Sequence, residues 1–515
     1  MRKTLKLLAL MLALALCLTA FAPALAEDKV TIKWLGYYTS NITVSEDTYA
    51  EKLIEDAFNV EIIPVTDVSA ENIDMFIASG DILDVTCYAS YLESDFQYMY
   101  DQEMIREFPE EWLWEYYPTG MQIYENYLGK DFFEAGNHLV EGRCLYTPFT
   151  TTTNTSEFVL LYRKDWLDNL GMKEPSTLDE LHDMLYAFTY NDPDGNGVND
   201  TYGIDVSTTW CGLWPVLGAF GLTSTLNGAG SFCLNDDGTV AYSTVSEEYK
   251  QALAIIEQWY NEGILDPSGI TDDRSAVRTK WANGTIGAMV DTQTWFYSNR
   301  GSSSIVAMVE EVFGEGTVDI LGPITSQYGD GKVYASRNYP MVSANRALSF
   351  TADATDEQII AVLKILEGMT ADHELMIRIL FGEENVDYIM TEEGQLQVLP
   401  HVSIEYMASK GISDTFYGYG ATDPYMATLT FSAKDRALIE KADAWPMLYT
   451  ARNFTDVKNE AKDQYLAEVQ KIETEFYHSV LLGTVDLEAG WEAYVANMNN
   501  AGLTRILAEY EELLK

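Results

Sequence analysis

The chain has 515 residues and a formal net charge of −48, because 80 acidic residues outnumber 32 basic ones. Such an excess of negative charge argues against nucleic acids and polyanions as default partners. Hydrophobic residues make up 47% of the chain, which is enough for a packed core and excludes a disordered acidic protein. A single core does not grow to this length, so we expect at least two domains.

Residues 1–26 have the features of a secretory signal peptide. Basic residues precede an apolar run that extends to about residue 20, and a small-x-small site ends at Ala26. We therefore expect a secreted, extracytoplasmic protein. Cys17 follows a leucine, a poor match to a lipoprotein processing site, so we expect no lipid anchor. No other apolar run reaches the roughly 18 residues that a membrane span requires.

The next segment alternates between predicted strands and helices. Strands are predicted over 30–34, 60–65 and 82–86, with helices over 46–58 and 72–79 between them. This alternation predicts a parallel sheet with helices on its faces. Ligands bind beyond the carboxyl ends of the strands in such sheets. The aromatic residues that follow the first and third strands are therefore candidate ligand contacts, with core packing as the alternative: Tyr38, Tyr88 and Tyr91.

A second α/β unit is predicted to begin near residue 157. Residues 158–163 have the pattern of a strand and 164–170 that of a short helix. Thr177 and Glu180 have the spacing of a capping box, which predicts that the helix over 177–190 begins there. Further on, the pattern predicts a strand over 287–291 and helices over 247–262, 355–370 and 433–443. After a break at Trp445 and Pro446, the rest of the chain is predicted to be helical.

Oxygen-bearing side chains alternate along the loop that follows the helix over 177–190, which is the pattern that opens an EF-hand calcium loop. The acidic residue expected at the twelfth position is absent, and Gly203 stands there. This is therefore not a helix–loop–helix sensor. A polar surface turn is the alternative. We predict a structural Ca²⁺ site, with Asp205 or water completing the shell, whose ligands are Asp192, Asp194, Asn196, the carbonyl of Val198, Asp200 and Thr201.

Five motifs in order carry a family resemblance: FVLLYRKDWLDNLG at 158–171, PSTLDEL at 175–181, NDPDGNG at 191–197, YNEGILDP at 260–267 and WEAYVANMNNAG at 491–502. Together they resemble the carbohydrate-type extracellular solute-binding proteins of ABC importers. The nearest similarity is to the lipoprotein-like and alginate-binding branch, which carries a calcium loop at this place. The resemblance covers nearly all of the chain after the signal peptide.

This resemblance implies an α/β, two-lobed, periplasmic-binding-protein-like fold with several interdomain crossings and a hinge. We expect the chain to cross between the lobes three times, so that each lobe is built from two segments. The N-terminal lobe is expected to comprise residues 27–155 and 341–425. The C-terminal lobe is expected to comprise residues 156–340, which include the calcium loop, and residues 426–515.

Sugars present apolar ring faces edged by hydroxyl groups, so a sugar site needs flat aromatic rings and polar edge partners. The chain has 33 Tyr and 11 Trp. The resemblance implies stacking rings at Trp295, Trp445 and Tyr88, each of which could instead serve only in packing. Three further residues are candidates because they lie in aromatic-rich or glycine-rich segments or at a strand end: Trp210, Tyr417 and Asp291.

We therefore expect a monomeric binding protein, not an enzyme. It would capture an oligosaccharide between its lobes and deliver it to the transmembrane permease subunits of an ABC transporter. The sequence has no Gly-x-Ser-x-Gly, phosphate-binding loop or His-Glu-x-x-His motif. A secreted glycoside hydrolase needs only two facing carboxylates, so it is the alternative. A cell-surface adhesion protein is the third possibility.

Four cysteines follow the signal peptide: Cys87, Cys144, Cys211 and Cys233. Export permits disulfides, and four cysteines allow three pairings. Cys211 with Cys233 is the shortest span and the first to test. Unpaired buried thiols are equally consistent with a protein of this size.

Overall fold

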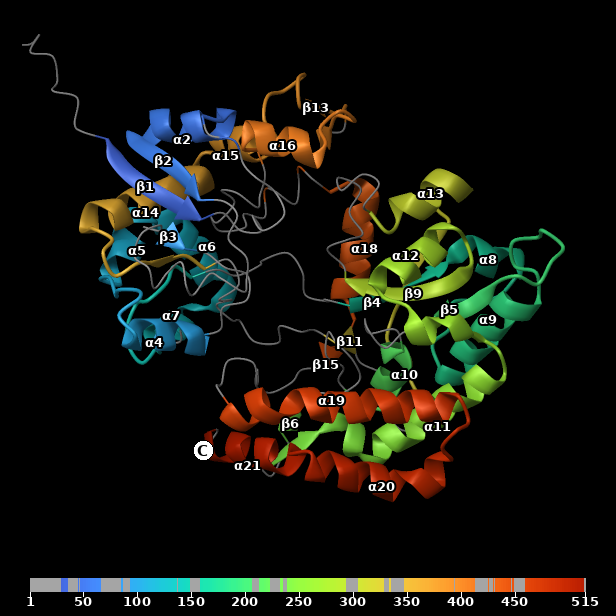
Figure 1. Ribbon diagram of the computed structural model, residues 1–515. Helices are drawn as coiled ribbons and strands as arrows, with labels where there is room; N and C mark the ends of the chain where they lie inside the picture. Colours follow the sequence, from blue (N-terminus) through green and yellow to red (C-terminus); the bar gives the residue numbers. More distant parts are fainter. Residues whose placement is uncertain are drawn as a thin grey trace, which may run out of the picture.

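The computed structural model has two lobes, one at the upper left of Figure 1 and the other at its right and base. In the part of the chain that is described, no helix combines the length and apolar character needed to cross a membrane. The residues that the structure describes are 29–35, 45, 47–65, 85–86, 93–136, 138–148, 158–205, 213–222, 232–234, 239–292, 304–327, 333–334, 347–392, 394–412, 425, 429, 431–445, 447–448 and 459–513.

The sheet of the first lobe has four strands in the order β12 (Ser349–Phe350), β3 (Val85–Thr86), β1 (Val30–Leu35) and β2 (Val60–Val65). β1 pairs in parallel with β2 and β3, whereas β12 is antiparallel to β3. Ile32 and Trp34 of β1 are buried, as expected of alternate side chains on one face of a strand. The predicted strands over 30–34 and 60–65 and their parallel pairing are confirmed.

Helices from two distant segments of the chain build the rest of this lobe. Their core joins residues between 32 and 144 to residues between 348 and 412. Thr355 and Gln358 form a capping box at the start of α14, which confirms the helix predicted over 355–370. The helices are α2 (Tyr49–Phe58), α4 (Glu93–Asp101), α5 (Glu111–Tyr116), α6 (Pro118–Leu128), α7 (Lys130–Glu134), α14 (Asp356–Ala371), α15 (His373–Phe381) and α16 (Ile404–Lys410).

The sheet of the second lobe is mixed and has five strands in the order β10 (Val318–Leu321), β4 (Phe158–Arg163), β9 (Ile286–Thr292), β5 (Tyr202–Asp205) and β8 (Leu265–Asp266). β5 is parallel to β8 and β9, whereas β4 is antiparallel to β9 and β10. Its helices include those predicted from the sequence, and the capping box of Thr177 and Glu180 is present. They are α8 (Lys164–Asn169), α9 (Leu178–Tyr190), α10 (Trp214–Ala219), α11 (Glu247–Asn261), α12 (Arg274–Ala282), α13 (Ala307–Phe313) and α18 (Ala433–Asp443).

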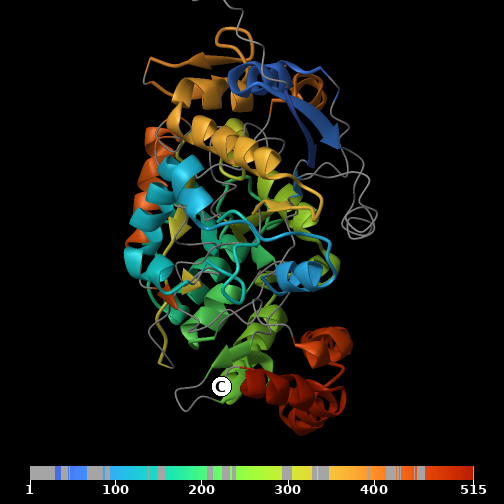
Figure 2. The same cartoon turned by 90° about the vertical axis from the view of Figure 1, so that its left-hand side faces the viewer.

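Three C-terminal helices form a layer at the base of the second lobe: α19 (Glu460–Leu481), α20 (Leu487–Asn500) and α21 (Leu503–Leu513) (Figures 1 and 2). They pack beside α11 and the hairpin of β6 (Phe232–Leu234) and β7 (Val240–Tyr242). Trp491 and Ile506 share one core with Leu160 of β4. Buried Glu473 accepts hydrogen bonds from Tyr242 (3.0 Å) and Thr244 (3.3 Å), which ties α19 to this hairpin.

Passes of the chain that are far apart in the sequence meet at two places. In the first lobe, the backbone N–H of Thr147 donates to Leu348 O (2.8 Å), and the N–H of Leu348 donates to Thr147 Oγ1 (3.0 Å). Near α10, β11 (Val333–Tyr334) pairs in parallel with β15 (Met447–Leu448). Segments that lead into the predicted crossings are therefore held side by side. The domain boundaries themselves stay a prediction.

The described cysteines are not paired. Cys144 is a buried free thiol, and Cys233 is a free thiol that lies 3.7 Å from Ala241 O. The disulfide between Cys211 and Cys233, which was the first pairing to test, is therefore absent because Cys233 is free. Cys87 and Cys211 lie outside the described residues.

A buried carboxylate fixes the segment after α15 to the first lobe. Asp387 accepts hydrogen bonds from Lys410 Nζ (2.6 Å), Tyr406 Oη (2.6 Å) and the N–H of Glu383 (2.8 Å). Lys410 also lies over the ring of Tyr49 on α2, at 4.9 Å from its centroid. Burial alone would raise the pKa of Asp387, but these donors outweigh it and hold the pKa below the ordinary value.

Replacement of Asp387 by Ala should destabilise the protein by about 2 to 3 kcal/mol, because it leaves Lys410 without its main partner. Since the pKa of Asp387 is lowered by folding, its contribution should be complete above the ordinary value of 3.8 and disappear as the pH falls through the lower, folded value. Urea unfolding across this pH range measures both effects. Glu384→Ala, an exposed change in the same segment, is the control. An equal loss in both variants would contradict the assignment.

Candidate calcium loop and ligand-binding region

The predicted calcium loop is held at its base by buried hydrogen bonds between α9 and β5. Thr201 Oγ1 donates to Phe188 O (2.7 Å), and the N–H of Gly203 donates to Thr189 Oγ1 (3.0 Å). Gly203 itself lies against α9, and a Cβ added there would stand 2.7 Å from Leu185 O. No larger side chain fits, which explains why the twelfth position of this loop carries no carboxylate.

Within the loop, one amide group links two of the acidic side chains. Asn196 Nδ2 donates to Asp194 (2.9 Å) and to Asp200 (3.2 Å), so both carboxylates face one point. Asp192 accepts from the N–H of Gly197 at 3.2 and 3.1 Å. Gly197 has a φ of 81°, a left-handed conformation that glycine adopts without strain. Carboxylate oxygens are the ligands that Ca²⁺ prefers, and here Asn196 directs its amide nitrogen toward two of them while its Oδ1 accepts from the N–H of Val198 (2.7 Å).

The structure thus joins Asp194, Asn196 and Asp200 by hydrogen bonds on one loop, whereas Asp192 accepts from the N–H of Gly197. Val198 is exposed, with 56% of its surface accessible. Thr201 is buried, and its hydroxyl donates a hydrogen bond to Phe188 O near the end of α9. Whether these residues bind a metal stays a prediction at this point.

Asp205 does not belong to the loop, because it takes part in a second acidic cluster at the other end of β5. Among the described residues, one group of three acidic side chains has ligand atoms within 4.8 Å of one another: Asp205, Asp266 and Asp272. Lys280 Nζ lies among them, at 2.9 Å from Asp205 and 2.6 Å from Asp266, and it also pairs with Asp272. The cation of this cluster is therefore the ammonium group of Lys280.

The carboxylates around Lys280 also set its protonation. Burial alone would lower the pKa of Lys280, but hydrogen bonds to Asp205, Asp266 and Asp272 raise it well above the ordinary value. Lys280 therefore stays charged at any pH at which the protein is folded. The cluster links α12, β5 and β8, and sequence inspection missed it because its members come from separate elements.

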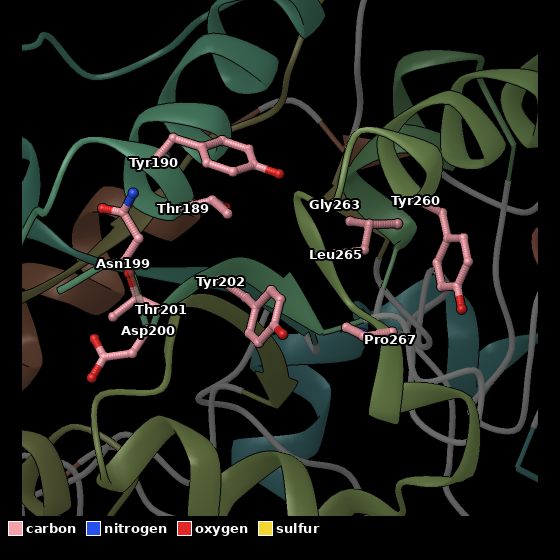
Figure 3. Close-up of a pocket in the computed structure, with 10 residues that line it drawn as sticks. All are labelled: Thr189, Tyr190, Asn199, Asp200, Thr201, Tyr202, Tyr260, Gly263, Leu265 and Pro267. Atoms are coloured by element: carbon pink, nitrogen blue, oxygen red, sulfur yellow. The ribbon is translucent and has the colours of Figure 1, made fainter.

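A cavity of about 410 Å³ lies between the end of α9, the calcium loop, β5 and the end of α11 (Figure 3). Tyr190 and Tyr202 point into this space, and Tyr260 stands at its far side. Backbone of the loop forms one portion of the wall, whereas the carboxylate of Asp200 turns away from the space. The volume is in the range of small-molecule sites in proteins.

Of the predicted sugar contacts, the structure describes Trp445 and Asp291. Trp445 is half-buried directly after α18, and its indole packs on Gly322, where a Cβ would stand 3.0 Å from Nε1. This position lies next to β15, where two passes of the chain meet. Six predicted contacts lie outside the described residues, so their roles stay predictions: Tyr38, Tyr88, Tyr91, Trp210, Trp295 and Tyr417.

Asp291 is fully buried near the carboxyl end of β9. Its carboxylate binds Arg274 and Arg278 of α12, with Arg278 Nε at 2.7 Å from Oδ2. The arginine side chains are more accessible, at 27% and 19% exposed. Asp291 therefore orients two guanidinium groups, and its direct contact with a ligand stays a prediction. Sequence inspection missed both arginines because their pairing requires the fold.

Three relatives resemble the chain in sequence, whereas no family model matches it. Lipoprotein LipO of Bacillus subtilis (strain 168) is 28% identical over 44% of this chain and 43% of LipO. The polygalacturonan/rhamnogalacturonan-binding protein YtcQ of the same strain is 23% identical over 69% of this chain and 67% of its own. The fructooligosaccharide ABC transporter substrate-binding protein FusA of Streptococcus pneumoniae serotype 4 is 22% identical over 67% of this chain and 63% of FusA. The chain thus spans less than half of LipO and about two thirds of YtcQ and FusA.

Solved structures match over nearly the whole chain. An HMO-binding solute-binding protein of Bifidobacterium longum infantis has a TM-score of 0.70 at 16% identity, over 95% of this chain and 99% of that one. The structure of S. pneumoniae FusA with kestose has a TM-score of 0.66 at 16% identity, over 94% of this chain and 98% of FusA. The fold is that of two-lobed substrate-binding proteins of ABC importers. Alginate-binding AlgQ2 also matches, with a TM-score of 0.63 at 18% identity over 95% of this chain and 98% of AlgQ2. These matches confirm the predicted fold class and the predicted resemblance.

The Lys280 cluster of this substrate-binding fold gives a direct test. Lys280→Ala leaves three carboxylates close together and should destabilise the protein by about 3 to 5 kcal/mol. Because those carboxylates then form an oxygen site, added Ca²⁺ should restore some of the lost stability. Thermal unfolding with and without calcium measures both effects. Lys130→Ala, which removes an exposed pair with Glu134, should change neither. A stable Lys280→Ala variant would contradict this account of the cluster.

Proposed function

We propose that this protein is an extracytoplasmic solute-binding protein of an ABC importer. It captures an oligosaccharide between its two lobes and delivers it to the transmembrane permease subunits, without chemical change to the sugar. The single observation that supports this most is the two-lobed substrate-binding fold over nearly the whole chain. The relatives YtcQ and FusA are named for binding carbohydrates, and FusA for an ABC transporter.

The arrangement of the chain supports binding by closure. We assign 27–155 and 341–425 to the first lobe, and 156–340 and 426–515 to the second. The separate hydrophobic cores are consistent with this assignment. Several passes held side by side near Thr147 and near β11 allow the lobes to move as near-rigid bodies about a hinge. A ligand that contacts both lobes then favours the closed form.

The described residues offer suitable sugar contacts in the second lobe. Trp445 presents a partly accessible flat ring beside β15, and such a ring can stack on the apolar face of a sugar. Arg274 and Arg278 provide charged donors for hydroxyl groups near the carboxyl end of β9, where ligands bind in open α/β sheets. The six predicted aromatic residues outside the described ranges would complete the site.

Sugar binding should be measured by calorimetry with neutral and acidic oligosaccharides. We expect at least one neutral oligosaccharide to bind, and Trp445→Ala to weaken it about tenfold, which corresponds to about 1.4 kcal/mol. Trp112→Ala, at a half-buried Trp on α5 of the first lobe, is the matched control.

Solution scattering should show compaction on binding, and chromatography should recover the sugar intact. Hydrolysis of the bound sugar would support the glycoside hydrolase alternative instead. Failure of every oligosaccharide to bind would refute the proposed function.

We further propose that the loop from Asp192 to Thr201 binds Ca²⁺ as a structural ion. The carboxylates of Asp194 and Asp200, which share Asn196 as a hydrogen-bond partner, support this, as does the positive φ of Gly197. A FusA structure described as an EF-hand mutant indicates that a fold of this kind can carry such a loop. The bound ion would neutralise the loop carboxylates and fix the end of α9 to β5.

A chelator should lower the melting temperature by several degrees, because an ion at about 100 times its Kd adds about 2.7 kcal/mol of stability. Calcium should restore it, and Asp194→Ala should abolish the dependence on calcium. Asp183→Ala, an exposed carboxylate on α9 outside the loop, should keep the dependence. If Asp194→Ala and the native protein respond to the chelator equally, the loop is not the calcium site.

A further inference from the structure

An exposed row of aromatic rings runs along the outer face of α9. His182, Tyr186 and Tyr190 are spaced four residues apart, which places them on one face of the helix. Their ring centroids lie 6.1 Å apart between His182 and Tyr186 and 4.8 Å apart between Tyr186 and Tyr190. Tyr186 is 43% exposed and Tyr190 40% exposed. The row is therefore a continuous aromatic surface that solvent can reach.

This row leads directly into the cavity shown in Figure 3. Tyr190 belongs to both, and its ring points into the cavity, which Tyr202 and Tyr260 also line. Among the described residues, none forms a hydrogen bond with the hydroxyl groups of Tyr186, Tyr202 or Tyr260. The cavity of about 410 Å³ thus combines ring faces with polar groups that have no partner within the described ranges.

Packing within the protein accounts for only one end of the row, where the ring centroid of His182 lies 5.8 Å from that of buried Trp259 on α11. Leu181, Leu185 and Phe188 on the opposite face of α9 supply its core contacts. Solvent-exposed pairs four residues apart stabilise a helix by only about 0.2 to 0.5 kcal/mol. Two contacts nevertheless fix the rings: Tyr190 Oη donates to Glu262 O (2.6 Å), and His182 Nε2 lies 2.6 Å from Glu262 Oε2. The rings of Tyr186 and Tyr190 therefore lie on a surface that solvent can reach.

The chemistry of the row selects one kind of ligand. Flat rings with hydroxyl tips match the alternating apolar faces and hydroxyl groups of sugars. The carboxylates of Asp183 and Glu262 lie beside the row, and the acidic calcium loop adjoins the cavity, so a polyanion would be repelled. The planes of successive rings are tilted by 33° and 46°, so the row forms a twisted surface. Such a surface suits a single glycan chain better than the flat face of a crystalline polysaccharide.

We propose that the aromatic row of α9 and the adjoining cavity form a second carbohydrate site, which binds a single uncharged glycan chain. In Figure 1, α9 lies toward the right of the second lobe, with β4, β9 and β5 between it and the first lobe. The site is therefore separate from the space between the lobes, and it remains accessible whether the lobes are open or closed. It would hold the protein on a polymer while the other site captures oligosaccharides.

Affinity electrophoresis tests for the second carbohydrate site by using polymers that are too long to be enclosed between the lobes. Gels would contain hydroxyethyl cellulose, soluble starch, inulin or polygalacturonate, all with saturating calcium so that the loop state is constant. At least one uncharged polymer should retard the native protein, and polygalacturonate should not. Tyr186→Ala with Tyr190→Ala should weaken the retardation at least tenfold. Tyr186→Ala alone, which removes no hydrogen bond formed by a described residue, should weaken it severalfold with an unchanged melting temperature.

Two controls separate this site from the one between the lobes. Tyr98→Ala, at an exposed tyrosine of α4 on the first lobe, should be retarded like the native protein. Trp445→Ala should also keep its retardation while it loses oligosaccharide affinity. The proposal is overturned if no uncharged polymer retards the native protein, if the folded Tyr186 variants are retarded normally, or if Trp445→Ala abolishes retardation.

Discussion

Each lobe depends on a segment that returns to it after the chain has visited the other lobe. Ile32 on β1 shares its core with Phe350 on β12 and Leu363 on α14, and Leu160 on β4 shares its core with Trp491 and Ile506. Neither core can close with the first segment alone, because the later segment supplies much of the buried apolar surface. Each core is therefore completed by residues from a later part of the chain.

The charge of the molecule is managed by pairing the few basic residues with buried acids. Lys280 stands among three carboxylates, Lys410 binds Asp387, and Arg274 with Arg278 binds Asp291. A buried carboxylate costs much free energy unless it is paired and hydrogen-bonded. The chain has 80 acidic and 32 basic residues, and among the described acidic residues only a few are buried.

Features with local causes were predicted well from the sequence. The strand over 158–163 and the helix over 433–443 have the predicted bounds, and Thr177 with Glu180 forms the predicted capping box, because these signals lie within a few residues. The start of α2 was placed too early, since Thr48 is the residue whose side chain caps it. Contacts across the sequence were not predictable. The Lys280 cluster draws on four separated positions, and the free thiol of Cys233 depends on where its strand lies. The aromatic row could have been found, because His182, Tyr186 and Tyr190 repeat every four residues.

The close contact between Gly203 and Leu185 also bears on any attempt to turn this protein into an optical calcium reporter. The usual route would install the missing glutamate at the twelfth loop position, but here that position is pressed against the helix backbone, and the new side chain would pry α9 from β5. A higher affinity for the proposed ion would have to come from a substitution nearer the tip of the loop, where Val198 is exposed to solvent. The close packing of Gly203 on α9 therefore limits which positions of the loop can be changed.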